Sequence, residues 1–333
     1  MLSVPPIGVV IPARNAAPWL ATALRSLLAQ TRAEWRAVVV DDGSTDATAA
    51  VASGFADRRI GLRRQAPAGV SAARNHGIAA LAGSTALLFL DADDALAPDA
   101  LARLDAGLRA APRAVAASGP YVMVRADDPS DDNPSDNGPP DDGAPDHARA
   151  EDGAVLSAAR RAGRVKPGIG GDVLARLLTR NRFANGGHLL IRAEAVARAG
   201  GFRPELRYGE DWEYWVRLAA LGPFVAAPGR RPVLFVRRRA AGAFLAAAAD
   251  TAAFAPALAA AFTAPAVLAR FEPGRLARLR RRMEAETAWV AGRALLWHGR
   301  RAEALGGLRR AWLARPSLRR AALLGLWHLG GPA

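Results

Sequence analysis

The eight residues from 87 to 94, Leu-Leu-Phe-Leu-Asp-Ala-Asp-Asp, restrict the possible folds more than any other part of this sequence. Their apolar half has the length of a buried strand, and it stops abruptly at three carboxylates. In an open α/β sheet, ligands bind outside the carboxyl ends of the strands. Acids two residues apart in an extended turn can converge on one hard cation and on the phosphates it carries. The run therefore predicts a buried strand with a ligand site at its end, and an acidic surface loop is the alternative interpretation.

Three other short apolar runs, Ile7–Ile11, Ala37–Val40 and Ile60–Arg63, precede this one and alternate with helical patterns. Four strands that alternate with helices predict a mostly parallel sheet connected by right-handed crossovers. The carboxyl ends of parallel strands share one edge, so the polar residues that follow the strands are expected to lie together. These residues are Asn15, Asp41, Asp42 and Asp91–Asp94.

Several classes of site are excluded. The chain has no cysteine, which rules out disulfides, thiolate zinc sites and cysteine nucleophiles. No G-x-G-x-x-G follows the first strand, and no P-loop is present. The run from Gly69 to Ala73, Gly-Val-Ser-Ala-Ala, lacks the closing glycine of a G-x-S-x-G elbow. A dinucleotide fold and a serine hydrolase are therefore not expected.

The second half of the chain predicts two further strands, an acidic loop and a helical end. Ala114–Arg125 has room for two strands, and residues 126–152, rich in Pro, Asp and Gly, predict a disordered acidic loop. The segments expected after the loop are a helix at Asp172–Leu178, a strand at His188–Arg192, a helix at Ala193–Ala199, and a helix from Glu210 whose face carries Trp212, Trp215, Val216 and Ala219. Beyond Pro228 the sequence turns to Ala, Arg, Leu and Trp at helical spacing. We expect an α/β domain over residues 1–228 and an all-helical region over residues 229–333.

The net charge of +14 is unevenly distributed. Residues 127–152 carry a net −9, which leaves +23 on the rest of the chain, and almost all of that charge is arginine. A basic body of this kind suits an anionic ligand, a nucleic acid or an anionic membrane face. A compositionally biased genome is the alternative explanation for the excess of arginine.

Targeting signals are not expected. The first six residues lack a charged segment followed by an apolar stretch, so no signal peptide is predicted. The longest uncharged stretch, Thr251–Ala269, is mostly alanine and contains two prolines, which argues against a transmembrane helix. The sequence predicts a cytoplasmic protein, with a peripheral position on the inner face of the plasma membrane left open.

With these segments placed, residues 7 to about 222 resemble the family 2 glycosyltransferases of the GT-A fold, whose Rossmann-related sheet is flanked by helices. Four motifs occur in the family's order: Val10-Ile11-Pro12-Ala13-Arg14-Asn15; Val40-Asp41-Asp42-Gly43-Ser44-Thr45-Asp46; Ala73-Arg74-Asn75 leading to Asp91-Ala92-Asp93; and Gly200-Gly201-Phe202 before Glu210-Asp211-Trp212. Each motif alone is a weak signal, but all four in order are a strong one.

The resemblance implies transfer of a sugar from a nucleotide-diphosphate sugar to an acceptor hydroxyl, with inversion. Asp93 would bind a divalent cation, Mg²⁺ or Mn²⁺, and Asp91 would contact the ribose or the metal. Arg74 would reach the nucleotide or the diphosphate. The residues implied at the nucleotide-sugar site are Pro12, Arg14, Asn15, Asp41, Asp42, Ser44, Arg74, Asn75, Asp91 and Ala92. Asp211 would be the general base, with Glu210 beside it.

The resemblance also implies a carbohydrate or lipid-linked acceptor, and a role in cell-surface polysaccharide or glycolipid synthesis. One departure concerns the stretch Val233–Arg239, which offers arginines where many relatives carry a metal-binding histidine. His188 lies elsewhere and is expected to be a core or loop histidine. Two alternatives stay open, a non-catalytic nucleotide-sugar binder and a basic nucleic-acid-binding protein. The second is not favoured, because Trp289, Trp297, Trp312 and Trp327 lie in helical rather than strand patterns.

Overall fold

The computed structural model describes residues 6–125, 164–238, 251–297, 299–317, 320, 321 and 324. The chain divides into two compact units. Unit 1 comprises residues 1–173, 183–205 and 221–240, and unit 2 comprises residues 174–182, 206–220 and 241–333. The acidic loop predicted over residues 126–152 lies outside the described residues.

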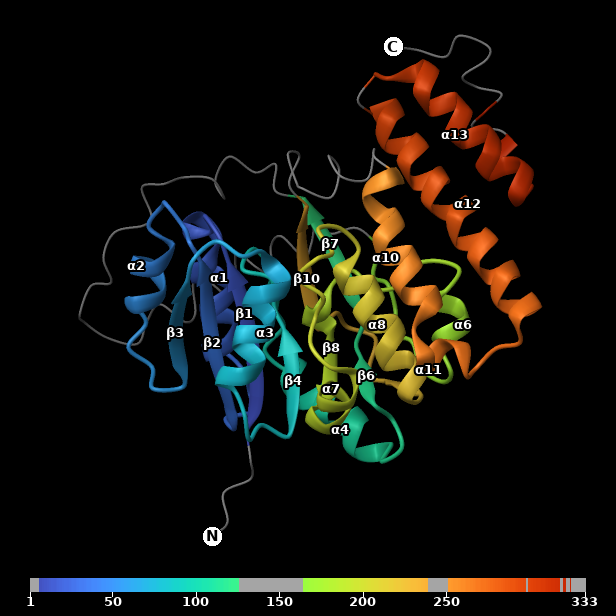
Figure 1. The fold of residues 1–333 in the computed structure, drawn as a ribbon. Helices are drawn as coiled ribbons and strands as arrows, with labels where there is room; N and C mark the ends of the chain where they lie inside the picture. Colours follow the sequence, from blue (N-terminus) through green and yellow to red (C-terminus); the bar gives the residue numbers. More distant parts are fainter. Residues whose placement is uncertain are drawn as a thin grey trace. The chain divides into compact units, whose positions relative to one another are not determined.

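Unit 1 is built on a seven-stranded mixed sheet in the order β3-β2-β1-β4-β8-β6-β9 (Figure 1). Its strands are β1 (Ile7–Ala13), β2 (Trp35–Asp42), β3 (Ile60–Gln65), β4 (Ala86–Phe89), β6 (Ala116–Ser118), β8 (Leu189–Arg192) and β9 (Phe224–Ala226). The first four are parallel neighbours, and β8 runs antiparallel to β4 and β6. The predicted α/β class with a mostly parallel sheet is therefore confirmed.

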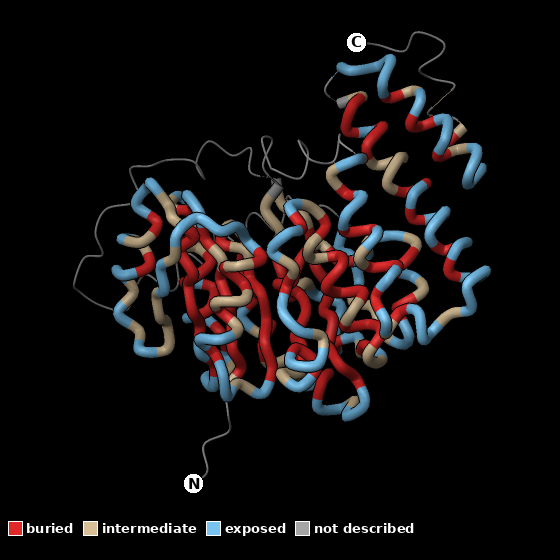
Figure 2. Tube along the Cα trace, in the orientation of Figure 1, coloured by how far each residue is buried: buried red, intermediate tan, exposed pale blue. Residues whose placement is uncertain are grey.

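The helices of unit 1 are α1 (Ala17–Leu28), α2 (Thr48–Ser53), α3 (Val70–Ala80), α4 (Ala100–Ala110), α7 (Ala193–Ala199) and the short η2 (Gly186–His188). Helix α3 packs on β1 and β2, and Gly77 makes this close approach possible. A Cβ atom at Gly77 would lie only 2.3 Å from Val10 Cγ1. The central strands β1, β2 and β4 are buried along almost their whole length (Figure 2). This apolar centre fixes the edge at which their carboxyl ends meet.

A second, three-stranded sheet in unit 1 was not predicted. It consists of β5 (Ala95–Leu96), β10 (Leu234–Arg238) and β7 (Tyr121–Arg125), with β10 in the middle. The region 229–333, for which only helices were expected, therefore begins with a strand. Leu234 and Phe235 are buried and pair with residues far away in sequence, and local helical spacing does not reveal such pairing. The domain boundary near residue 228 otherwise stays a prediction.

Unit 2 is helical. Its helices are α6 (Leu174–Leu177), α8 (Glu210–Leu221), α10 (Thr251–Thr263), α11 (Pro265–Leu268), α12 (Pro273–Trp297) and α13 (Arg301–Ala314). The predicted face of α8 is buried, and Trp212 packs against Phe254 with ring centroids 5.0 Å apart. Trp212 Nε1 also donates to the carbonyl oxygen of Leu177. Across the part of the chain that the structure describes, no helix has both the length and the apolar character needed to cross a bilayer.

Candidate functional site at the carboxyl edge of the sheet

The acidic run directly after β4 forms the centre of the candidate site. Asp91 accepts hydrogen bonds through both carboxylate oxygens, from Arg74 Nη2 at 3.2 Å and from Asn185 Nδ2 at 3.0 Å. Arg74 is only 5% exposed, and its guanidinium carbon lies 5.1 Å from the ring centroid of Phe202. Three segments of the chain, from α3, from β4 and from the loop before η2, are thus joined at one carboxylate.

Asp94 lies at the same edge of the sheet, but its side chain is buried. It is 3% exposed, and its two oxygens accept from Asn185 Nδ2 at 2.5 Å and from the backbone N–H of Arg237 at 2.9 Å. Burial, followed by the charges of Asp91 and Asp93, raises the pKa of Asp94 well above its usual value. Asp94 is thus a brace between the acidic run and two distant segments.

Asn185 joins these two carboxylates, and the sequence analysis missed it. Its Nδ2 group bridges Asp91 and Asp94, and its Oδ1 atom accepts from the backbone N–H of Gly187 at 2.9 Å. The residue is buried, so its orientation is fixed by these partners. The sole signal in the sequence is an asparagine before two glycines and a strand, which is too common to identify a site.

In the stretch Val233–Arg239, the described residue Arg237 lies against the acidic run. Arg237 contributes its backbone N–H to Asp94, and its Nε atom donates to the backbone oxygen of Asp93 at 3.2 Å. The arginine therefore places a fixed positive charge beside the carboxylates, where the resemblance led us to look for a histidine.

The loops after β1 and β2 are locked together beside this run. The backbone N–H of Asn15 donates to Ser44 Oγ at 3.0 Å, and Asn15 Oδ1 accepts from the backbone N–H of Thr45 at 2.8 Å. Asn15 has φ 49°, the left-handed region that Asn tolerates better than most residues. Because β1 lies between β2 and β4 in the sheet, these loops border the acidic run. Asn15 and Ser44 thus shape a wall of the candidate site.

Asp41 and Asp42 at the end of β2 are held by their own surroundings. Asp41 is fully buried and accepts from the backbone N–H of Ser44 at 2.9 Å and from Arg64 Nε at 3.2 Å. Asp42 accepts from Gln65 Nε2 and from the backbone N–H groups of Ala68 and Gly69. Burial favours protonation of Asp42, but these hydrogen bonds outweigh it and lower its pKa. Asp41 and Asp42 therefore hold the loops after β2 and β3 in place, whether or not they also contact a ligand.

Asn75 connects the Ala73-Arg74-Asn75 motif to the Gly200-Gly201-Phe202 motif by hydrogen bonds. Its Nδ2 group donates to the backbone oxygen of Phe202 at 2.8 Å, and its Oδ1 atom accepts from the backbone N–H of Phe202 at 2.7 Å. A Cβ atom at Gly201 would lie 2.6 Å from this Oδ1 atom, which explains the glycine. Asn75 thus orients Phe202, whose ring faces Arg74.

The other implied residues of the nucleotide-sugar site have different surroundings. Pro12 is half-buried at the end of β1, Arg14 is exposed near Asp42, and Ala92 is buried between the acids. Their contact with a nucleotide stays a prediction.

Glu210 and Asp211 begin helix α8 in unit 2. The backbone N–H of Trp212 donates to Asp211 Oδ1 at 2.5 Å. Burial, and then the negative charges of Asp211 and Glu210, raise the pKa of Tyr208 to about 12. Both acids lie in the first turn of α8, where the helix dipole is favourable for negative charge. Their catalytic part stays a prediction.

The acidic run has the oxygen chemistry that a hard divalent cation prefers. Asp91 and Asp93 are partly exposed carboxylates that fit such an ion, whereas Asp94 is almost completely buried and is held by Asn185 and the backbone of Arg237. Over the described residues, no group of three acids or histidines could hold a metal ion by itself. A cation here would therefore draw further ligands from water and from the phosphates of a bound nucleotide.

Comparison with known proteins agrees with this geometry. Residues 8–151 match the family model described as glycosyl transferase family 2. This part of the chain is a family 2 glycosyltransferase domain. The succinoglycan biosynthesis protein ExoO of Rhizobium meliloti is 40% identical over 105 residues, which are 30% of this chain and 29% of that protein. The chain aligns with only 27% to 42% of the length of such curated relatives.

Solved structures show the fold of the glycosyltransferase domain. Staphylococcus aureus TarS 1-349 in complex with UDP matches with a TM-score of 0.59 and 14% identity, covering 97% of this chain and 87% of that one. The mannosyltransferase PcManGT from Pyrobaculum calidifontis, in complex with GDP-Man and Mn²⁺, matches with a TM-score of 0.56 and 21% identity, covering 98% of this chain and 81% of that one. The predicted GT-A fold is confirmed.

Proposed function

We propose that this protein transfers a sugar from a nucleotide-diphosphate sugar to an acceptor hydroxyl, with inversion at the anomeric carbon. The observation that carries the proposal is the joint hold on Asp91 by Arg74 and Asn185, at the edge where ligands of such sheets bind. The UDP and GDP-Man complexes of the matched structures support a nucleotide-sugar donor.

Arg74 and Asp91 would act on the leaving diphosphate. The buried guanidinium of Arg74 is oriented by Asp91 and by the Phe202 ring, so it does not need to reorganise as negative charge develops. Guanidinium groups also match the geometry of phosphate oxygens. Asp91 could keep this orientation through its contact with Asn185 while it contacts the ribose or a cation.

Asp93 and Asp91 would hold the Mg²⁺ or Mn²⁺ ion. When bound, such an ion supplies electrostatic neutralisation of the diphosphate. The Mn²⁺ in the PcManGT structure supports this assignment. The guanidinium of Arg237 beside Asp93 would add a permanent positive charge to the same region.

Asp211 would accept the proton of the acceptor hydroxyl as that oxygen attacks, with Glu210 as its neighbour in the first turn of α8. The N-terminus of a helix is a favourable place for the negative charge of such a base. Direct attack opposite the leaving group inverts the anomeric configuration.

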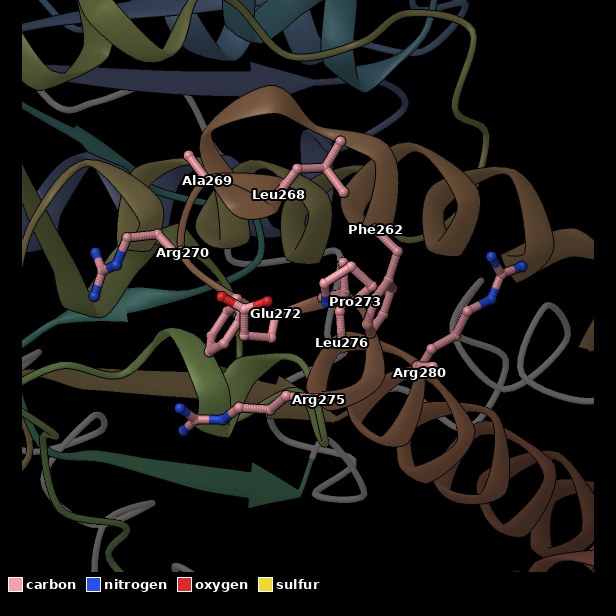
Figure 3. A pocket seen from close by; sticks show the side chains of 11 residues that line it. Phe262, Leu268, Ala269, Arg270, Glu272, Pro273, Arg275, Leu276 and Arg280 are labelled. Atoms are coloured by element: carbon pink, nitrogen blue, oxygen red, sulfur yellow. The ribbon is translucent and has the colours of Figure 1, made fainter.

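For the acceptor we propose a glycan or a lipid-linked sugar in cell-surface polysaccharide or glycolipid synthesis, as the relation to ExoO suggests. A cytoplasmic protein with such an acceptor would work at the inner face of the plasma membrane. We propose that unit 2 reaches that membrane through the corner formed by α10, α11 and the start of α12. This corner contains a cavity of about 720 Å³ with Phe262, Pro273 and Leu276 at its centre, and Arg270 and Arg280 point outward on opposite sides (Figure 3).

The residues of this corner suit a peripheral contact. Leu268 is 49% exposed at its edge, whereas Ala264 and Val267 beside it in the same turn of the chain are buried. An exposed leucine beside arginines combines apolar insertion with attraction to anionic headgroups.

The experiment that tests the transfer reaction is a screen of nucleotide sugars, with release of the nucleotide diphosphate as readout. One donor should be hydrolysed in a cation-dependent manner, and Asp93→Asn should abolish this turnover without changing the melting temperature. The matched control is Asp99→Asn, since Asp99 is a half-exposed acid just beyond the run. Full turnover in Asp93→Asn, or equal loss in both variants, would contradict the assignment.

A further inference from the structure

A second charged cavity lies in unit 2, among residues that the transfer reaction does not use. Its volume is about 220 Å³, and four arginines line it, Arg180, Arg293, Arg315 and Arg320, with Glu286 as their one carboxylate. The arginines come from the segment after α6, from α12 and from the residues that follow α13, so the fold brings them together from distant positions.

Glu286 is already neutralised. It is 7% exposed, and its oxygens form ion pairs with Arg180 Nε at 3.2 Å and with Arg320 Nη2 at 2.7 Å. Arg320 is equally buried and also donates to the backbone oxygen of Ala311 at 2.9 Å. The Glu286–Arg320 pair therefore forms the floor of the cavity, and Glu286 is not available to neutralise the other arginines.

The remaining positive charge has no carboxylate partner. Within the described ranges, no ion pair is formed by Arg293 or Arg315, and both are exposed at the cavity. Burial and the neighbouring charges of Arg180, Arg176 and Arg315 lower the pKa of Arg182 next to this cluster. Like charges held this close repel one another, and a bound anion would offset that repulsion.

We propose that this cavity binds the phosphate group of a phosphorylated ligand. Two exposed guanidinium groups match a phosphate mono- or diester, because arginine binds two phosphate oxygens at once. Beneath them, Glu286 is shared by Arg180 and Arg320, so these three side chains keep a net charge of +1. The half-buried ring of Trp289, which also lies 5.0 Å from the guanidinium carbon of Arg320, provides a flat wall for the carbon skeleton next to the phosphate. The site is independent of the proposed transfer reaction, since none of its residues belongs to the candidate donor site.

The test uses the full-length protein and glycerol 3-phosphate as probe, titrated calorimetrically at constant ionic strength. We expect saturable binding, weakened by about tenfold or more in the double variant Arg293→Gln/Arg315→Gln. The matched control is Arg278→Gln/Arg281→Gln, which removes the same charge from exposed positions of α12, the helix that also carries Arg293. The control should bind within about twofold of the wild type, because exposed charges outside the cavity are screened by salt.

A second arm identifies the source of the phosphate. Flotation with phosphatidylglycerol vesicles and with neutral phosphatidylcholine vesicles tests a lipid headgroup, and glycerol 3-phosphate tests a soluble or glycan-borne phosphate. Loss of either interaction in the cavity variant alone supports the proposal and assigns the source. Equal weakening in both double variants would overturn it, as would the absence of any interaction that depends on the cavity. Donor hydrolysis should be unchanged in both variants, so a failure here is distinguishable from a failure of the proposed function.

Discussion

Acidification should destabilise unit 1 through one residue, His188. Its side chain is 1% exposed and lies between the rings of Tyr121 and Phe183, at centroid distances of 4.6 Å and 5.5 Å. The nitrogen Nδ1 is 3.0 Å from the carbonyl oxygen of Gly119, to which it must donate. The other nitrogen, Nε2, accepts from the backbone N–H of Ala184 at 3.4 Å. The ring is therefore neutral, and a second proton would place two donors face to face.

The size of the effect follows from linkage. Burial lowers the pKa of His188 from 6.5 to about 4, although the carbonyl of Gly119 partly opposes the shift. Because the unfolded chain binds the proton first, stability is complete above pH 6.5, falls as the pH drops below it, and reaches its full loss below pH 4. The complete loss is about 3 kcal/mol, and about 2 kcal/mol of it is lost between pH 7.5 and pH 5.

The assay is urea denaturation of the wild type and of His188→Gln at pH 7.5, 6.5, 5.5 and 5. Glutamine removes the titration, so the difference between the two proteins cancels the contributions of carboxylates that titrate in both. The wild type should lose about 2 kcal/mol more than the variant across this range. Equal losses, or an imidazole resonance of His188 that titrates near pH 6.5, would refute the reasoning. Ala184 and His188 flank Asn185, so the same protonation should also weaken donor binding.

Two further predictions concern unit 2. Asp211→Asn should lower kcat by about 10²–10⁴-fold while donor affinity changes by less than about tenfold, because a general base acts only as the bond forms. Donor binding lost in proportion to rate would make Asp211 a binding or structural residue, and full activity would point to Glu210. Leu268→Asp should reduce flotation with anionic vesicles, whereas Leu313→Asp, at a still more exposed leucine in α13, should not. Flotation that is the same in both variants would argue against membrane docking through the α10–α12 corner.

The sequence predicted the parts of the fold that depend on local pattern. The runs at β1, β2, β3 and β4 are continuous enough to be recognised as strands, and their alternation with helices predicts that they run parallel. The position of Asn15 and Asp91 at one edge followed from the same reasoning. His188, expected to be a core or loop histidine, is confirmed as a buried core residue.

The missed features depend on contacts between distant residues. Strand β10 is short, and its pairing with β5 and β7 leaves no periodic signal in its own residues. Asn185 belongs to no motif, because its task is to join two acids 94 and 91 residues away. The sequence also could not show that the side chain of Asp94 is buried. The three acids of the run differ only in their partners, which come from distant segments.

The braces on Asp94 also set an order of events during synthesis. The ribosome makes Asp94 91 residues before Asn185 and 143 residues before Arg237. At bacterial and eukaryotic elongation rates that interval lasts on the order of ten seconds, long compared with the formation of helices and local strand pairs. The nascent chain can therefore pair β1, β2 and β4 early, but it carries an unsatisfied carboxyl group at their edge until β10 has emerged. The donor edge is therefore expected to be the last part of unit 1 to fold. Until it has folded, its unpaired polar groups are exposed to chaperones.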